Sequence, residues 1–243
     1  MTAAGRLARS CLLAFALTAG LLARPDYRNP PRTYTLVQVQ GRTYRLEKTL
    51  SQALGLRAAR RFNQNFRAGL DLLPAHARSE LRSLKLYIME GPRAPGGGRD
   101  NGLEYFRPEA AQFRPDIDPR WAHCVVCYCA QNYLDLSDLW ALKVILHEQA
   151  HAYQLAHYPE QQPDLVAAWQ NARALGLYRN LTDDEGKHHQ QAYALTNQLE
   201  YFSELSVMYF ARCNYPPYDR AELRKYDPQG YAVIEKLWRI GAR

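Results

Sequence analysis

The spacing of apolar and polar residues predicts long helices joined to a few short strands. Apolar residues recur at helical spacing through 53–73, 138–158 and 188–211, and a shorter amphipathic stretch covers 231–240. The second of these helices is expected to begin after an N-cap at Asp135 or Ser137 and to end near Tyr158, before Pro159. The pattern therefore predicts several long helices.

Strands are expected at three places. Residues 33–46 alternate on both sides of Gln40-Gly41, which predicts a β-hairpin. Apolar runs at 84–89 and 122–130 predict two further strands, the first after a short helix at 77–84, and the Gly- and Pro-rich stretch 91–102 predicts a loop between them. We expect an α+β fold in which a small sheet packs on the helix at 138–158.

The first 23 residues resemble an export signal. Arg6 and Arg9 precede an apolar run at 11–22 that is short for a transmembrane helix, although an uncleaved membrane anchor is the alternative. Residues 24–50 are expected to form a linker and hairpin, a candidate propeptide, and residues 51–243 the main domain. We expect a secreted or cell-envelope (periplasmic) protein with no stable membrane insertion once the signal is removed.

The charge argues against a nucleic-acid partner. The formal net charge is +7, and removal of Arg6 and Arg9 with the signal would lower it to +5. No run of basic residues follows that could track a phosphate backbone, so we expect no nucleic-acid binding. We also expect a monomer.

Four cysteines would remain after the signal: Cys124, Cys127, Cys129 and Cys213. An even number in an exported chain favours one or two disulfides, although the closely spaced three could instead belong to a second metal site. Because Cys213 follows the helix at 188–211, we expect it to lie near the strand at 122–130 and to bridge to one of its three cysteines.

The chemistry is carried by His147-Glu148-Gln149-Ala150-His151, an HExxH motif inside the helix at 138–158. Residues four apart share one face of a helix, so His147 and His151 can bind one zinc ion. Glu148 is placed to take a proton from a water on that ion. Two exposed histidines on a surface helix would be the simpler interpretation, but the flanking residues are apolar.

A catalytic zinc ion usually has a third protein ligand. Glu200 is the candidate, with Glu204 fixing a ligand histidine and Tyr193 hydrogen-bonding the reacting carbonyl oxygen, because the three share one face of the helix expected at 188–211. Glutamates on amphipathic helices are most often solvated, yet Glu200 lies among apolar neighbours. The competing third ligands are His188 and His189, and His157 lies near the end of its own helix.

These residues resemble a known family. HExxH, followed by a Tyr seven residues before the first Glu of Glu-Tyr-Phe-Ser-Glu, is similar to the catalytic domain of anthrax lethal factor and its single-domain bacterial relatives, over about 139–211. The resemblance implies a zincin-like metallopeptidase of the gluzincin group, with one zinc ion on His147, His151 and Glu200. Glu148 and Tyr193 would be catalytic, and Glu204 would support a ligand.

The sequence thus predicts an exported zinc-dependent endopeptidase that hydrolyses peptide bonds in a peptide or protein substrate. The strand at 124–130 is expected to pair with an extended substrate. Two alternatives stay open: a catalytically silent binding module with a zincin fold, and a zinc amide hydrolase acting on cell-wall peptide.

Overall fold

The computed structural model describes residues 25–241. The export signal expected at 1–23 lies outside these residues. Within the described part of the chain, no helix is both long and apolar enough to span a bilayer.

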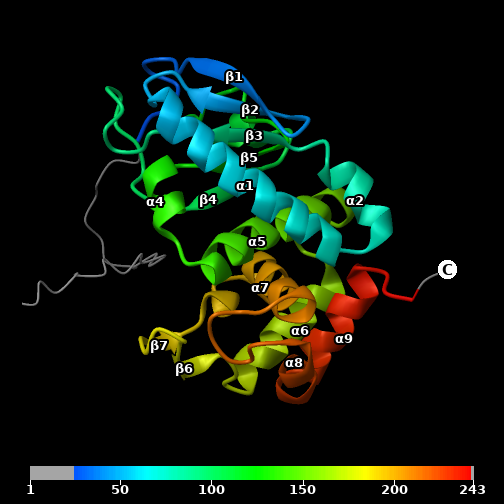
Figure 1. Ribbon diagram of the computed structural model, residues 1–243. Helices are drawn as coiled ribbons and strands as arrows, with labels where there is room; N and C mark the ends of the chain where they lie inside the picture. Colours follow the sequence, from blue (N-terminus) through cyan, green and yellow to red (C-terminus); the bar gives the residue numbers. More distant parts are fainter. Residues whose placement is uncertain (1–24, 242–243) are drawn as a thin grey trace, which may run out of the picture.

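A five-stranded mixed sheet forms the upper half of the molecule (Figure 1). The strands are β1 (Tyr34–Val39), β2 (Arg42–Glu47), β3 (Lys85–Ile88), β4 (Leu103–Phe106) and β5 (Cys124–Cys127), in the order β1-β2-β3-β5-β4. β2, β3 and β5 are parallel, and the two edge strands β1 and β4 run antiparallel to their neighbours. The hairpin and the strands at 84–89 and 122–130 are confirmed, whereas the sequence did not reveal β4.

The central strands are buried on both faces, which explains their continuous apolar runs. In β5, Val125 and Cys127 face the main core, while Cys124 and Val126 face a second core that contains Trp121. This second core lies on the face of the sheet opposite α1 and α5, so the sheet is a middle layer and not a surface.

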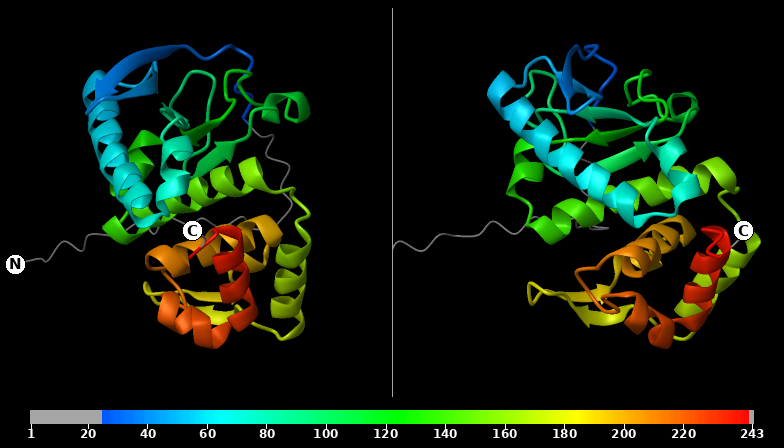
Figure 2. Two further views of the ribbon diagram at one scale, coloured as in Figure 1. Left: turned by 90° about the vertical axis from the view of Figure 1, so that its right-hand side faces the viewer. Right: turned by 45° about the vertical axis from the view of Figure 1, so that its right-hand side comes forward.

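The helix that carries the HExxH motif, α5 (Asp138–His157), lies between the sheet and the C-terminal helices in all three views (Figures 1 and 2). Ser137 caps it by accepting a hydrogen bond from the Trp140 amide, and it ends before Pro159, as predicted. α1 (Gln52–Leu72) crosses it closely at Gly69, where a Cβ would collide with Gln149. The helix α5, which carries the HExxH motif, therefore packs against other elements on both sides.

Short helices connect the strands of the upper half: α2 (Ala75–Leu81), α3 (Ala110–Phe113) and α4 (Ala130–Asp135). Below α5 the chain forms α6 (Pro163–Ala174), a hairpin of β6 (Arg179–Thr182) and β7 (His188–Gln191), the short 3-10 helix η1 (Tyr193–Leu195), α7 (Gln198–Phe210), α8 (Arg220–Tyr226) and α9 (Pro228–Leu237). These elements define the α+β class that the sequence predicted.

The long helix expected at 188–211 is only half present. Residues 188–191 pair with β6 as a strand, and α7 begins at Gln198. The physical reason is the Asn197 side chain, which accepts hydrogen bonds from the Leu199 and Glu200 amides at 2.9 Å each and so caps the helix there. Tyr193 consequently does not share a helix with Glu200.

The region before α1 is not an exposed linker. β2 pairs with β3, so the hairpin at 34–47 shares one sheet with the domain that was expected to begin at 51. Tyr27 packs into the second core, and the buried Arg32 guanidinium pairs with Glu47 at 2.9 Å. Arg32 also donates to the carbonyl oxygens of Gly96 and Gly97, so this segment ties the hairpin to the loop that precedes β4.

Candidate metal centre

Three side chains converge where α5 meets α7. His147 Nε2 lies 3.0 Å from His151 Nε2 and 3.0 Å from Glu200 Oε2, and His151 Nε2 lies 3.1 Å from the same carboxylate oxygen. The two histidines are one turn apart on α5, and Glu200 is in the first turn of α7. The predicted convergence of these three residues is confirmed.

The donor set suits a transition metal. Two imidazole nitrogens and one carboxylate oxygen are ligands that zinc accepts, and tetrahedral bonds of about 2.0–2.1 Å keep ligand atoms roughly 3.3 Å apart. The observed separations are close to that value. Among the described residues, these three form the group of His, Cys, Asp and Glu side chains that could hold a metal ion.

The electrostatic environment also favours a cation. Glu148, Glu200 and Glu204 bring three carboxylates into the region, and Lys143 is the buried ammonium beside them. With these four groups ionised and both histidines neutral, as metal binding requires, an excess of two negative charges remains in a largely buried space. A divalent cation on the three converging side chains would balance that excess.

A second set of contacts fixes the orientation of His147. Its Nδ1–H donates to Glu204 Oε1 at 2.8 Å, which leaves Nε2 directed at the cluster. Glu204 Oε2 in turn lies 2.9 Å from Lys143 Nζ and accepts a hydrogen bond from the Tyr215 hydroxyl. Lys143 also donates to Asn214 Oδ1 at 2.6 Å. Glu204 therefore contacts one of the two motif histidines, as the sequence predicted.

The pKa values of these groups follow from their contacts. Burial alone would lower the pKa of His147, but hydrogen bonds to Glu200 and Glu204 outweigh it and raise the pKa to about 10. Burial alone would raise the pKa of Glu204, but the charge of Lys143 and the hydrogen bond from His147 lower it to about 2. Without a metal, the cluster therefore holds protons that a metal ion would displace.

Glu148 is buried beside the cluster and is held from the other side by the sheet. The backbone N–H of Tyr105, in the edge strand β4, donates to Glu148 Oε2 at 2.7 Å. Burial raises the pKa of Glu148 to about 7, although the nearby histidine charges act in the opposite direction. A carboxyl group with such a pKa can both accept and return a proton near neutral pH.

Tyr193 approaches the cluster from η1 and not from α7. Its ring centroid is 5.8 Å from that of His147. Burial and the neighbouring charges of Glu200 and Glu148 raise the pKa of its phenol well above the usual value, so the hydroxyl keeps its proton and can donate it in a hydrogen bond. The sequence predicted that Tyr193 lies near the cluster, but on the helix of Glu200 and not on η1.

The competing histidines lie elsewhere. His157 Nε2 is 2.7 Å from Glu80 Oε2, and His189 Nε2 is 2.7 Å from Asp183 Oδ2. His188 is exposed on β7. None of the three belongs to the group of converging side chains.

The expected disulfides are absent among the described residues. Cys124, Cys127, Cys129 and Cys213 are all buried free thiols. Cys213 follows α7, and its Sγ lies 3.8 Å from Glu204 Oε2 on that helix, whereas Cys124 and Cys127 lie in β5. In Figure 1, α5 lies between α7 and the sheet. The expectation that Cys213 would approach this strand was wrong because the motif helix passes between them.

The strand expected to pair with substrate also needs correction. β5 is hydrogen-bonded to β3 on one side and to β4 on the other, so its backbone has no free edge. β4 is the terminal strand on this side of the sheet. Backbone groups alternate in direction along a strand, so those of Leu103 point to the same outer side as the Tyr105 N–H that reaches Glu148.

Sequence reasoning missed Lys143 and Tyr215. Lys143 is one turn before His147 on α5 and 4% exposed, which is rare for lysine unless it is paired. Lys143 is the one lysine among the apolar residues of α5, and this pattern could have indicated a buried, paired cation. Tyr215 follows α7 in an irregular segment, and no sequence pattern separates it from the other tyrosines.

No protein-family model, curated protein or solved structure matches this chain. The geometry of the cluster and the chemistry of its residues are therefore the basis for proposing a function.

Proposed function

We propose that this protein is an exported zinc-dependent endopeptidase with a zincin-like fold. The observation that carries the proposal is the convergence of His147 Nε2, His151 Nε2 and Glu200 Oε2 within 3.1 Å of one another, with Glu148 buried beside them. The resemblance of this motif pair to the lethal factor catalytic domain supports the same conclusion. The resemblance of residues 1–23 to an export signal supports a secreted or cell-envelope location.

Each residue has a distinct task in this proposal. Zinc held by His147, His151 and Glu200 would supply a Lewis acid that lowers the pKa of water and polarises a carbonyl group. Glu148 takes the proton of the attacking water and returns it to the leaving amine. Tyr193 donates a hydrogen bond to the carbonyl oxygen as negative charge develops there.

The edge of β4 is the surface that fits an extended substrate. Its outer backbone groups lie on the same side as the Tyr105 N–H that contacts Glu148, so a chain pairing with them would pass beside the proposed base. The peptide or protein substrate would add a sixth strand to the sheet. This arrangement replaces the earlier assignment of the substrate strand to residues 124–130.

Metal analysis and an unbiased digest test the proposal together. We expect one zinc per purified chain, and cleavage of a peptide library that a chelator abolishes and added zinc restores. One equivalent of iron in place of zinc would contradict the assignment, because two histidines and a carboxylate can also hold iron. Zinc without any cleavage would favour the silent binding module, and cleavage confined to cell-wall peptide would favour the amide hydrolase.

Replacing Tyr193 by Phe tests the role of its hydroxyl. We expect kcat on the best library peptide to fall about 10²–10³-fold with unchanged zinc content, because the carbonyl oxygen loses one hydrogen bond in the transition state. Tyr218→Phe is the matched control, since that ring stacks on Arg212 away from the cluster. Equal activities in the two variants would remove Tyr193 from the mechanism.

A further inference from the structure

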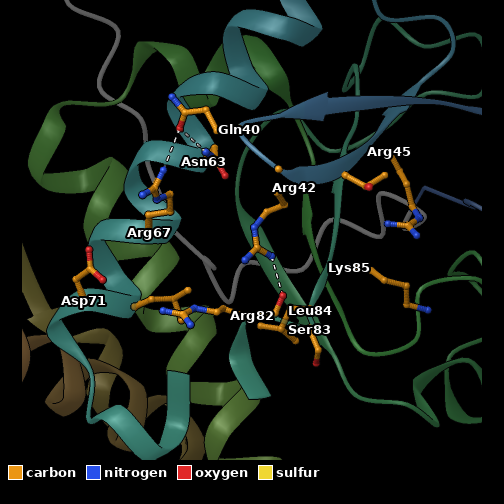
Figure 3. A pocket seen from close by; sticks show the side chains of 13 residues that line it. Gln40, Arg42, Arg45, Asn63, Arg67, Asp71, Arg82, Ser83, Leu84 and Lys85 are labelled. Atoms are coloured by element: carbon orange, nitrogen blue, oxygen red, sulfur yellow. Dashed lines mark hydrogen bonds between the residues drawn. The ribbon is translucent and has the colours of Figure 1, made fainter. Parts of the chain in front are cut away.

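A large polar pocket lies away from the metal centre, at the ends of β2 and β3 where these strands begin (Figure 3). Its volume is about 610 Å³. The β1–β2 turn, the second half of α1 and the segment between α2 and β3 form its walls. It shares no residue with the cluster of His147, His151 and Glu200, and none of the tasks proposed above uses it.

Basic side chains dominate the lining. Five cations face the pocket against a single carboxylate, that of Asp71, which leaves a formal excess of four positive charges. The five are Arg42, Arg45, Arg67, Arg82 and Lys85. Among residues 25–241, none of the five forms an ion pair, whereas the buried Arg32 and the partly buried Arg99 and Arg114 are each paired with an acid.

Two of the cations, Arg42 and Arg45, are held in place by contacts with neutral groups. Arg42 stacks on the Phe66 ring, with 4.3 Å from its guanidinium carbon to the ring centroid, and donates to the Arg82 carbonyl oxygen at 3.1 Å. Arg45 lies over the Tyr87 ring at 5.4 Å on the opposite face of the sheet. In Figure 3, Arg67 and Arg82 lie on the α1 side of Arg42, and Arg45 and Lys85 lie on the other side. The pocket therefore wraps around the end of the sheet.

This arrangement is electrostatically costly without an anion. Arg42 is half-buried, and burial together with the neighbouring charge of Arg82 lowers its pKa. Arg45 and Lys85 are also partly buried, whereas Arg67 and Arg82 are exposed. Partly dehydrated cations that lie near one another repel, and a bound anion would offset that repulsion. Neutral hydrogen-bonding groups, Gln40, Thr43, Asn63 and Ser83, complete the lining.

We propose that this pocket binds a compact soluble anion that carries two or more phosphate groups. Guanidinium groups match phosphate oxygens in bidentate pairs, and phosphate brings more charge into a given volume than carboxylate does. The excess of four positive charges requires more than one phosphate. An extended nucleic acid fits less well, because the five cations line one pocket at the end of the sheet and form no long basic track.

Calorimetric titration with fructose bisphosphate tests the site. We expect saturable binding of one equivalent, at least about tenfold weaker binding of fructose monophosphate, and an affinity that falls as salt rises. Arg42→Gln and, separately, Lys85→Gln should each weaken binding about tenfold or more. Arg57→Gln is the matched control, since this exposed arginine of α1 does not line the pocket and its replacement removes the same charge.

Four further results would contradict the proposal. Binding that is unchanged in Lys85→Gln and in a folded Arg42→Gln protein, or that is weakened equally by Arg57→Gln, would overturn the proposal. So would tighter binding to a single-stranded oligonucleotide, or binding to vesicles containing phosphatidic acid without binding to the soluble bisphosphate. Circular dichroism of each variant shows whether Arg42, which stacks on Phe66, can be replaced without unfolding; if it cannot, Lys85→Gln alone decides.

Discussion

Glu148→Gln is expected to keep its zinc and to lose nearly all turnover, about 10²–10⁴-fold in kcat. The amide has the same shape as the carboxyl group and can still meet the Tyr105 backbone N–H with its oxygen. It cannot, however, accept the proton of the attacking water. The measurement is the steady-state cleavage rate of a library-derived peptide, with metal content determined on the same preparation.

Glu185→Gln supplies the control for that experiment. Glu185 is exposed in the turn between β6 and β7 and makes no side-chain contact with the cluster, so the same chemical change there should leave kcat unaltered. Full activity in Glu148→Gln would mean that another group takes the proton. The proposed mechanism would then be wrong even if zinc were present.

Glu200→Ala is expected to abolish tight zinc binding. The substitution removes one of three protein ligands, whereas loss of an outer contact alone typically weakens metal affinity about 10–100-fold. We therefore expect more than a 100-fold loss, measured by competition with a chelator of known affinity. Activity should disappear with the metal.

His189→Ala distinguishes Glu200 from the competing ligands. His189 pairs with Asp183, outside the cluster, so its removal should leave zinc affinity unchanged. Zinc retained in Glu200→Ala and lost in His189→Ala would reverse the assignment of the third ligand. That outcome would also require β7 to leave its present pairing with β6.

The parts of the site that sequence could predict are those set by local geometry. Two histidines one helical turn apart must share a face, and the apolar flanks of α5 required that face to be buried. Glu200 and Glu204 are likewise one turn apart on α7. We expected the histidine pair and the glutamate pair to meet, because a catalytic zinc ion usually has a third protein ligand. In the structure, both histidines lie beside Glu200, and Glu204 contacts His147.

The features that the sequence did not predict depend on contacts between residues far apart in the chain. Residues 188–191 are polar and carry no strand signal, yet they form β7 because β6 lies beside them. The substrate edge was assigned to β5 because sequence does not give strand order, and β4 occupies the edge instead. The cysteines could not be placed because the interposition of α5 between Cys213 and β5 is a property of the tertiary fold.

Because Lys143 and Glu204 form a buried ion pair, the effect of a substitution at one position should depend on the residue at the other. Lys143 alone would be an unpaired buried cation, and Glu204 alone would leave its charge balanced only by His147. Breaking such a pair by one substitution typically costs about 3–5 kcal/mol, whereas exchanging both partners can cost much less. In descendants of this sequence, the two positions should covary: Lys143 and Glu204 should be retained together or replaced together.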